Sequence, residues 1–208
     1  LGFVQIATIQ NVVRAHHHIL WSRNQNYRSK MIDKHLGRAG DLFEHFTHDA
    51  SMIPSEFYPF WRRRFAQRQK IVENWNYHDQ SEEGAEIDVI IERIRQDGPL
   101  STEAFDTKVK GDKQMWDRPP HKKTLDYLWY AGILATSHRV GFRKHYDLAE
   151  KVVPKEHFEN HVEDGAQLDW LCRAALDRMG IATASDIKKF WEAVSPAEVK
   201  NWLSDCQL

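Results

Sequence analysis

The sequence has only two cysteines, Cys172 and Cys206, among its 208 residues. Two thiols are too few for a disulfide framework or a thiolate metal site, and they favour a reducing, cytoplasmic compartment. No apolar run approaches the roughly 18 residues that a membrane-spanning helix needs, which excludes a transmembrane protein. The chain does not begin with Met and shows no charged-then-apolar leader, so we interpret it as a fragment or a trimmed chain.

Net charge is almost absent, because 29 Lys and Arg stand against 30 Asp and Glu, for a formal net charge of -1. Hydrophobic residues at 41% and charged residues at 28% are ordinary values, and they exclude a disordered or collagen-like chain. The length allows one large domain or two small ones. A neutral total does not exclude a polyanionic partner, because local basic patches decide that.

Common catalytic motifs are also missing: no phosphate-binding loop, dinucleotide fingerprint or Gly-x-Ser-x-Gly turn occurs. The run His16-His17-His18 does not predict a metal site, because three consecutive helical residues point in different directions. His48, Asp49 and Ser51 form a poor triad on paper, since triad members usually come from separate elements. We expect neither a metal nor a cofactor.

Hydrophobic spacing predicts a mainly α fold with short β hairpins, of the α+β class. Extended chain is predicted over 1–8 and 42–53. The predicted helices cover 9–20, 30–36, 55–76, 85–96, 123–131 and 164–179.

The order of elements in the middle of the chain is that of a winged helix. A helix over 85–96, a turn, a short helix capped by Ser101 and a helix over 123–131 precede strands over 133–138 and 142–148. The segment after 164 resembles the start of another such module. We therefore expect tandem winged-helix modules over 1–80, 81–154 and 155–208, with the first boundary in the polar stretch 77–84.

Basic residues gather on the two elements that touch DNA in a winged helix. They flank the predicted groove helix or lie on the wing: Lys108, Lys110, Lys113, Lys122, Lys123, Arg139, Arg143 and Lys144. A second group lies in 61–70, which holds five cations in ten residues. Trp21, Trp61 and Trp116 are candidates for a wedge between bases, although we expect such residues in the core.

Three blocks near the start of the chain form a distinctive pattern: Leu1-Gly2-Phe3-Val4-Gln5-Ile6-Ala7-Thr8-Ile9, Arg14-Ala15-His16-His17 and Leu20-Trp21-Ser22-Arg23. The pattern continues through 43–44, 48–51, Pro54, 98–101, Trp116, Arg139, Gly141, 146–148 and Pro154. It resembles the AlkZ/YcaQ family of DNA glycosylases, and the resemblance is most specific in the first blocks. The resemblance implies tandem winged helices and excision of purines alkylated at N7, including the unhooking of interstrand crosslinks. Members of the family are longer at both ends, so this chain resembles an internal portion.

The resemblance also implies the site residues. The family positions a water with a Gln-x-Asp or Gln-x-Gln motif, whose first member matches Gln5 and whose second falls on Ala7. The expected DNA-binding residues are Arg14, His16, Arg23, His48, Arg62, Arg63, Lys122, Lys123, Arg139, Arg143 and Lys144.

Ala7 has neither carboxylate nor amide, and this departure leaves three explanations open. The chain is an engineered knockout, a natural non-catalytic relative, or a variant that uses another acid, for which Asp49 and Glu44 are the nearby choices. The alternative functions are a non-catalytic winged-helix DNA-binding protein or transcription regulator, and a protein-interaction module. For the DNA-binding functions, we expect the protein to be a monomer that binds damaged double-stranded DNA. We do not expect it to bind a membrane.

Overall fold

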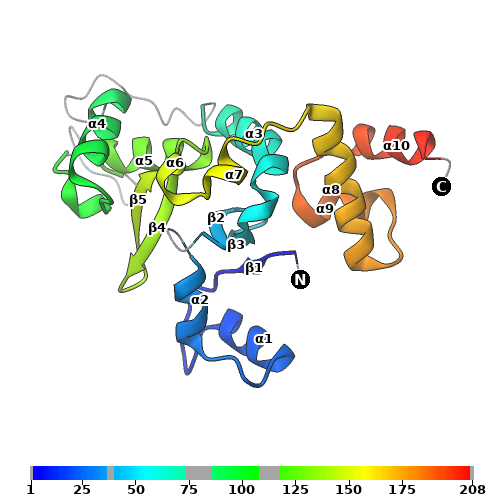
Figure 1. The fold of residues 1–208 in the computed structure, drawn as a ribbon, viewed down its shortest axis with the longest axis horizontal. Coiled ribbons are helices and arrows are strands. Elements are labelled where there is room, and N and C mark those ends of the chain that lie inside the picture. Colours follow the sequence, from blue (N-terminus) through cyan, green and yellow to red (C-terminus); the bar gives the residue numbers. More distant parts are fainter. Residues whose placement is uncertain (1, 37–39, 74–85, 108–117, 207–208) are drawn as a thin grey trace.

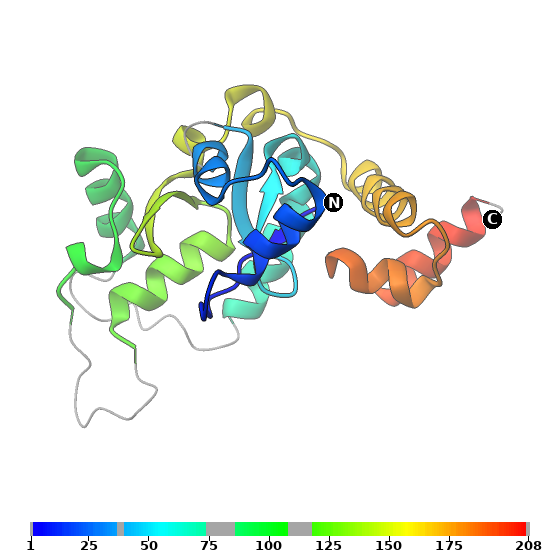
Figure 2. The same ribbon diagram turned by 90° about the horizontal axis from the view of Figure 1, so that it is seen from below.

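The computed structural model describes residues 2–36, 40–73, 86–107 and 118–206. It contains two small antiparallel sheets surrounded by helices. The predicted class, mainly α with short β hairpins, is confirmed. Figures 1 and 2 both place α8 (Asp164–Met179) and α10 (Pro196–Asp205) at one end of the molecule and α4 (Ile87–Asp97) at the other, with the three-stranded sheet between them. No helix in the described ranges is long and apolar enough to cross a membrane.

The three-stranded sheet has the order β1-β3-β2 and contains β1 (Val4–Gln5), β2 (Leu42–Phe46) and β3 (Ala50–Pro54). The two extended segments predicted from the sequence supply all three strands. Two helices, α1 (Ala15–Arg23) and α2 (Ser29–His35), connect β1 to β2 and extend from the sheet on one side of the molecule (Figure 1).

The helix predicted over 9–20 begins later than expected, at Ala15. Val12 and Val13 are β-branched and lose side-chain freedom in a helix, which disfavours helical backbone before Ala15. Gln10 and Arg14 pair instead as an isolated antiparallel bridge. The predicted single helix over 55–76 is likewise divided, into the 3-10 helix η2 (Ser55–Trp61) and α3 (Arg62–Glu73), because Pro59 has no N–H to donate.

The middle of the chain follows the predicted order of elements. After α4 come the one-turn 3-10 helix η3 (Thr102–Ala104), α5 (Pro120–Tyr130) and the hairpin of β4 (Leu134–Val140) and β5 (Arg143–Leu148). The Ser101 hydroxyl accepts the N–H of Glu103 and caps η3 as expected. The predicted boundary at 77–84, Lys108, Lys110, Lys113 and Trp116 lie outside the described residues.

The C-terminal part is helical throughout, with α6 (Ala149–Val152), α7 (Lys155–Phe158), α8, α9 (Ala184–Trp191) and α10. Thr183 and Ser195 begin α9 and α10 with reciprocal side-chain capping bonds to Asp186 and Glu198.

Two large hydrophobic cores organise these elements. The first core joins the β2–α3 region to the C-terminal helices, and its central contact is between Trp61 and Trp191, both fully buried, with ring centroids 5.7 Å apart. The second core fills the space between α4, α5 and the β4–β5 hairpin. Val72 at the end of α3 belongs to this second core and links the two parts of the chain.

Candidate active site

Gln5 is the last residue of β1, and Ala7 follows it by two positions in the segment that leaves the strand. Successive residues of an extended strand alternate in direction, and the intervening Ile6 is buried in a small apolar cluster with Ile32 and Met52. β1 pairs with β3 so that Val4 faces Met52 and Gln5 faces Ser51. The sequence motif therefore lies at an exposed sheet edge beside the turn between β2 and β3.

A cavity of about 440 Å³ opens at this edge. Gln5, Ala7, His18 and Asp49 all line it, together with Thr8, Ile9, Asn11, Val13 and Ala15. Gln5 comes from β1, His18 from α1 and Asp49 from the β2–β3 turn, so three separate segments meet here. The two positions predicted to be catalytic thus share one cavity with an acidic side chain.

Asp49 lies in the turn that adjoins the pairing of β1 with β3. That pairing is extended past Gln5 by one hydrogen bond, because the Ile6 N–H donates to the Ala50 carbonyl oxygen at 2.7 Å. Ala7 follows Ile6 and Asp49 precedes Ala50, and both residues line the cavity. Asp49 is exposed, and one of its carboxylate oxygens accepts the Ala50 N–H at 2.8 Å, which fixes its direction.

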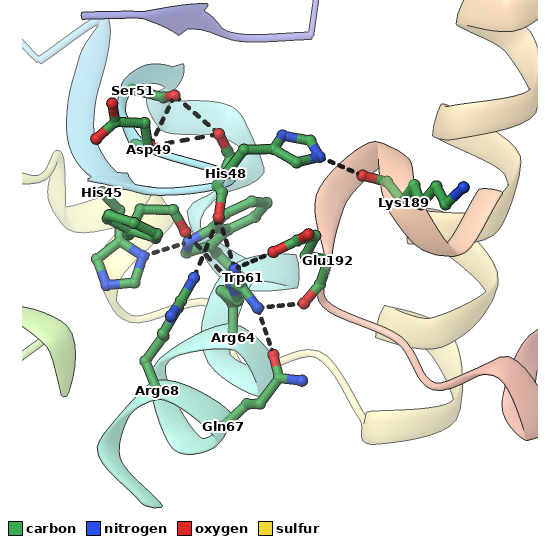
Figure 3. Close-up of polar contacts among 12 residues, drawn as sticks. His45, His48, Asp49, Ser51, Trp61, Arg64, Gln67, Arg68, Lys189 and Glu192 are labelled. Atoms are coloured by element: carbon green, nitrogen blue, oxygen red, sulfur yellow. Dashed lines mark hydrogen bonds and ion pairs between the residues drawn. The ribbon is translucent and has the colours of Figure 1, made fainter. Parts of the chain in front are cut away.

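The turn that carries Asp49 is fixed by contacts to distant elements (Figure 3). The Arg64 and Arg68 guanidinium groups donate to the Thr47 carbonyl oxygen at 2.7 and 3.2 Å. His48 Nε2 donates to the Lys189 carbonyl oxygen at 2.5 Å, and a carbonyl acceptor requires the proton on Nε2. Helices α3 and α9 therefore hold the turn in place.

The triad that could be drawn from His48, Asp49 and Ser51 does not form. The His48 ring points away from Ser51 toward Lys189 in Figure 3. Ser51 is fully buried, and its hydroxyl lies 2.8 Å from the hydroxyl of Thr47. Neither side chain is arranged for nucleophilic catalysis.

His16, predicted to contact DNA, instead supports the strand. Its ring is 3% exposed, and its Nδ1 accepts the Ala7 N–H at 3.0 Å, which requires a neutral ring with the proton on Nε2. Burial, assisted by the nearby charges of His17, Arg14 and Arg139, lowers the pKa of His16 to about 4. His16 thus fixes the backbone at the cavity rather than facing a phosphate.

Arg14 has a similar supporting position. It donates to the Thr8 carbonyl oxygen, and its guanidinium carbon lies 3.6 Å above the Phe142 ring at the tip of the β4–β5 hairpin. Arg139 also lies over Phe142, at 4.6 Å. The hairpin tip and the segment that follows β1 are therefore in contact.

Glu44, the other acid considered for catalysis, is buried and bound to two basic residues of the protein. It lies on β2, and its carboxylate accepts hydrogen bonds from Arg139 at 2.7 and 2.9 Å. The same carboxylate forms an ion pair with Lys144 at 3.1 Å. Burial alone would raise the pKa of Glu44, but Lys144 and Arg139 outweigh it and hold the pKa below its usual value. Lys144 also lies 3.2 Å above the centre of the Trp129 ring. Arg139 and Lys144, predicted to bind DNA, thus bind the hairpin to the sheet.

Two further basic residues predicted to bind DNA hold helices together. Arg62 donates to the Phe158 carbonyl oxygen, and Arg63 pairs with Asp164 at 3.0 Å and with Glu198. Sequence reasoning could not assign these partners, because they lie on α7, α8 and α10, far along the chain. Most of the basic run in α3 is in this way directed inward.

The remaining predicted DNA contacts differ in exposure. Arg23, His48 and Arg143 are exposed, and Lys122 and Lys123 are half-buried on α5. Arg143 pairs with the exposed Glu103. Of the predicted wedge residues, Trp61 is in the core as expected, whereas Trp21 is half-exposed, contrary to that expectation.

His18 and Trp21 are the side chains whose positions the sequence did not reveal. His18 was considered only within the three-histidine run, although its helical position on the face of α1 that meets Gln5 was the usable signal. In the part of the chain that the structure describes, no three His, Cys, Asp or Glu side chains could together hold a metal ion.

Comparison with known proteins gives one family. The model of the family described as DNA glycosylase AlkZ-like matches residues 1–207. No solved structure matches the chain.

Proposed function

The chain belongs to the AlkZ-like DNA glycosylase family, and from this premise we propose that it hydrolyses the N-glycosidic bond of N7-alkylated purines, crosslinked ones included, in double-stranded DNA. The observation that carries the proposal is the cavity that Gln5, Ala7 and Asp49 share. Its chemistry fits a reaction that needs a positioned water and a carboxylate beside a sugar.

The reaction places specific demands on the protein. Cleavage of the bond between C1′ and N9 develops positive charge on the deoxyribose, as in glycoside hydrolysis. A purine alkylated at N7 is already cationic, so it takes the bonding electrons and leaves as a neutral base. Water then forms a bond to C1′ and gives up a proton. The protein must orient this water, accept its proton and stabilise the sugar cation.

Gln5 and Asp49 divide these tasks in the proposed mechanism. The Gln5 amide binds the attacking water through its carbonyl oxygen or its NH₂ group. The Asp49 carboxylate stabilises the sugar cation and receives the proton, in place of the acid that the family motif puts at position 7. The support is geometric, since Ala7 and Asp49 adjoin the hydrogen bond between Ile6 and Ala50 and both line the cavity.

DNA would be held by the modules proposed from the sequence, over 1–80, 81–154 and 155–208. The middle one has the elements of a winged helix in order, with α4, η3 and α5 packed on the β4–β5 hairpin around a shared core. Leu100 adds a short third pairing to Tyr146 of β5. In this arrangement α5, with Lys122 and Lys123, enters the groove and Arg143 on the hairpin meets the backbone.

One observation favours a second function. Ala7 cannot supply the motif's acid, and a chain whose Asp49 does not replace it would bind DNA without releasing a base. The second candidate is therefore a non-catalytic DNA-binding protein that keeps the fold of the family.

The test measures single-turnover release of N7-methylguanine from a duplex. The chain as it stands should release the base, and Asp49→Asn should slow release by on the order of 10²- to 10⁴-fold. Adding Ala7→Asp to Asp49→Asn should restore part of the rate. Asp177→Asn, an exposed acid on α8, is the matched control and should leave release unchanged.

Two outcomes would reject the proposal. If Asp49→Asn releases the base as fast as the unchanged chain, another group does the work assigned to Asp49. If no version releases the base while all bind DNA, the second function holds.

A further inference from the structure

A second cavity, of about 520 Å³, lies between α1 and the start of α2. Its lining is rich in rings and carries one cation: it consists of Val13, His17, His18, Trp21, Gln25, Tyr27, Arg28 and Ser29. The proposed mechanism uses none of these rings. The volume falls in the range of small-molecule sites, roughly 300–1,000 Å³.

Helical spacing brings the rings together. Trp21 follows His17 by four positions and His18 by three, so its ring is next to both histidines along α1. Tyr27 reaches the same face from the connection to α2, and its hydroxyl lies 2.8 Å from His17 Nδ1. The His17 and Tyr27 rings are near-parallel, at 29°, with centroids 6.0 Å apart. One side of the cavity is thus a fixed pair of flat surfaces.

Trp21 leaves an unusually large aromatic surface open to solvent. Its side chain is 50% exposed, whereas Trp61 and Trp191 are fully buried in the first core. Burying the exposed part of this ring against a ligand would be favourable, because it removes apolar surface from water. A flat ligand would cover the indole in this way.

This ring-lined cavity adjoins the candidate active site. Val13 and His18 line both cavities, so the two cavities are neighbours. A nucleotide whose C1′ lies near Gln5 and Asp49 would therefore have neighbouring bases within reach of Trp21.

The charge of this region matches a polyanion. The first 40 residues contain six Lys and Arg but only one acidic residue, Asp33, although the whole chain has a formal net charge of -1. Arg28 at the cavity donates to the carbonyl oxygens of Gln25 and Tyr27, at 3.0 and 2.8 Å, and these neutral acceptors leave its positive charge in place. A phosphate group beside the cavity would be attracted to it.

We infer that the ring-lined cavity binds a nucleobase that has left the stack of the DNA helix, with the base on Trp21 and its phosphate near Arg28. Stacking on aromatic rings is the general way in which proteins hold unstacked bases, because every base has a flat π face. The inference depends on the proposed function only for its ligand, DNA. The base is either the alkylated base specifically or any unpaired base, and the test below separates these two cases.

The experiment measures the affinity of the full chain for three duplexes that differ at one position. One is fully paired, the second has N7-methylguanine facing a stable abasic analogue, and the third has ordinary guanine facing that analogue. A 2′-fluorinated sugar at the lesion prevents base release during the measurement. An unpaired base is already partly unstacked, so the chain should bind the second or third duplex more tightly than the first.

Trp21→Ala should remove this preference, with a loss on the order of 5- to 150-fold for the preferred duplex and little change for the paired one. Trp21→Phe should retain most of the preference, because it keeps a flat ring. Ile181→Ala, at a residue 96% exposed on the connection between α8 and α9, is the matched control and should change nothing. Arg23 lies on α1 outside the cavity, and Arg23→Ala should lower the affinity for all three duplexes by the same factor.

Which base the cavity takes follows from which duplex is preferred. Preference for the second alone assigns the cavity to the alkylated base, and preference for both the second and the third assigns it to any unpaired base. Equal affinity for all three duplexes, or a preference that survives Trp21→Ala, overturns the inference. Because no base release is measured, the inference can hold even where the proposed catalytic function fails.

Discussion

Arg139 donates two hydrogen bonds, of 2.9 and 2.7 Å, to the two carboxylate oxygens of Glu44, a residue 95 positions earlier in the chain. Glu44 is fully buried on β2, and Lys144 completes the cluster from β5. The three charges join the hairpin to the three-stranded sheet and keep Phe142 beside Arg14, next to the cavity.

Replacing Glu44 with Ala should therefore destabilise the protein strongly. Arg139 and Lys144 would keep two positive charges in a site without the carboxylate that neutralises them, and breaking a buried pair costs about 3–5 kcal/mol. Urea unfolding at neutral pH measures the change. Glu103→Ala removes the partner of Arg143 at an exposed pair and is the matched control, with an expected cost below about 1 kcal/mol. Equal effects of the two variants would contradict the role given to Glu44.

Stability should decrease as the pH falls below 6.5, because His16 is held neutral. Its pKa is about 4 in the folded protein against an ordinary value of 6.5, so the unfolded chain binds more protons between these values. The contribution is complete above pH 6.5 and is lost progressively as the pH falls toward 4. At pH 5 the loss should be about 2 kcal/mol.

His16→Asn isolates this effect. Asn keeps a side-chain acceptor for the Ala7 N–H but does not titrate, so urea unfolding of this variant should lose less stability between pH 7.5 and pH 5. His45, whose pKa burial also lowers well below its ordinary value, remains in both proteins and contributes equally to each. The same pH dependence in the variant would assign the loss to other groups.

Gly132 should tolerate alanine less well than Gly98 does. Both glycines have a positive φ, 73° and 82°, so alanine is strained at either position. A Cβ at Gly132 would come within 2.7 Å of the Phe65 ring, whereas a Cβ at Gly98 meets nothing within 4 Å. Gly132→Ala should cost about 1–3 kcal/mol more than Gly98→Ala in thermal or urea unfolding. A smaller cost at Gly132 would show that the Phe65 ring moves freely.

The salt dependence of DNA binding should separate the basic residues that face solvent from those that bind the protein to itself. Lys122→Ala and Arg23→Ala should each reduce the slope of log affinity against log salt by about 1, because each removes one phosphate contact. Arg63→Ala should leave this slope unchanged and lower stability instead, since Arg63 pairs with Asp164 and Glu198. Titrations between 50 and 200 mM salt provide the measurement, and an unchanged slope for Lys122→Ala would remove α5 from the interface.

Features that depend on neighbours in the sequence could be predicted well. Helix α8 has the predicted bounds, because its apolar positions recur at helical spacing and Gly180 ends it with a positive φ of 76°. Ser101 and Ser195 could be identified as caps for the same reason, since a cap and the N–H that it accepts lie within three residues.

Partners distant in the sequence could not be predicted. The arginines of α3 carry the same charge whether they face a phosphate or a carboxylate, and only the fold brings Asp164 and Glu198 to Arg63. Asp49 and Glu44 were equal choices as the missing acid from the sequence, and only the fold puts Asp49 in the cavity that Ala7 lines and covers Glu44 with the hairpin.

The first hydrophobic core has a consequence for the order in which the protein is made. Trp61 packs against Trp191, and the turn that carries Asp49 donates a hydrogen bond to the Lys189 carbonyl oxygen. Nearly the whole chain must therefore leave the ribosome before these two contacts can form. Among the described residues, the buried members of the second core lie between Ile90 and Leu148 apart from Val72, so most of this core can close earlier. During synthesis, the middle of the molecule is thus expected to fold first. Until the C-terminal helices are made, Trp61 and Phe43 remain exposed to solvent, and this apolar surface makes the partly folded chain prone to aggregation.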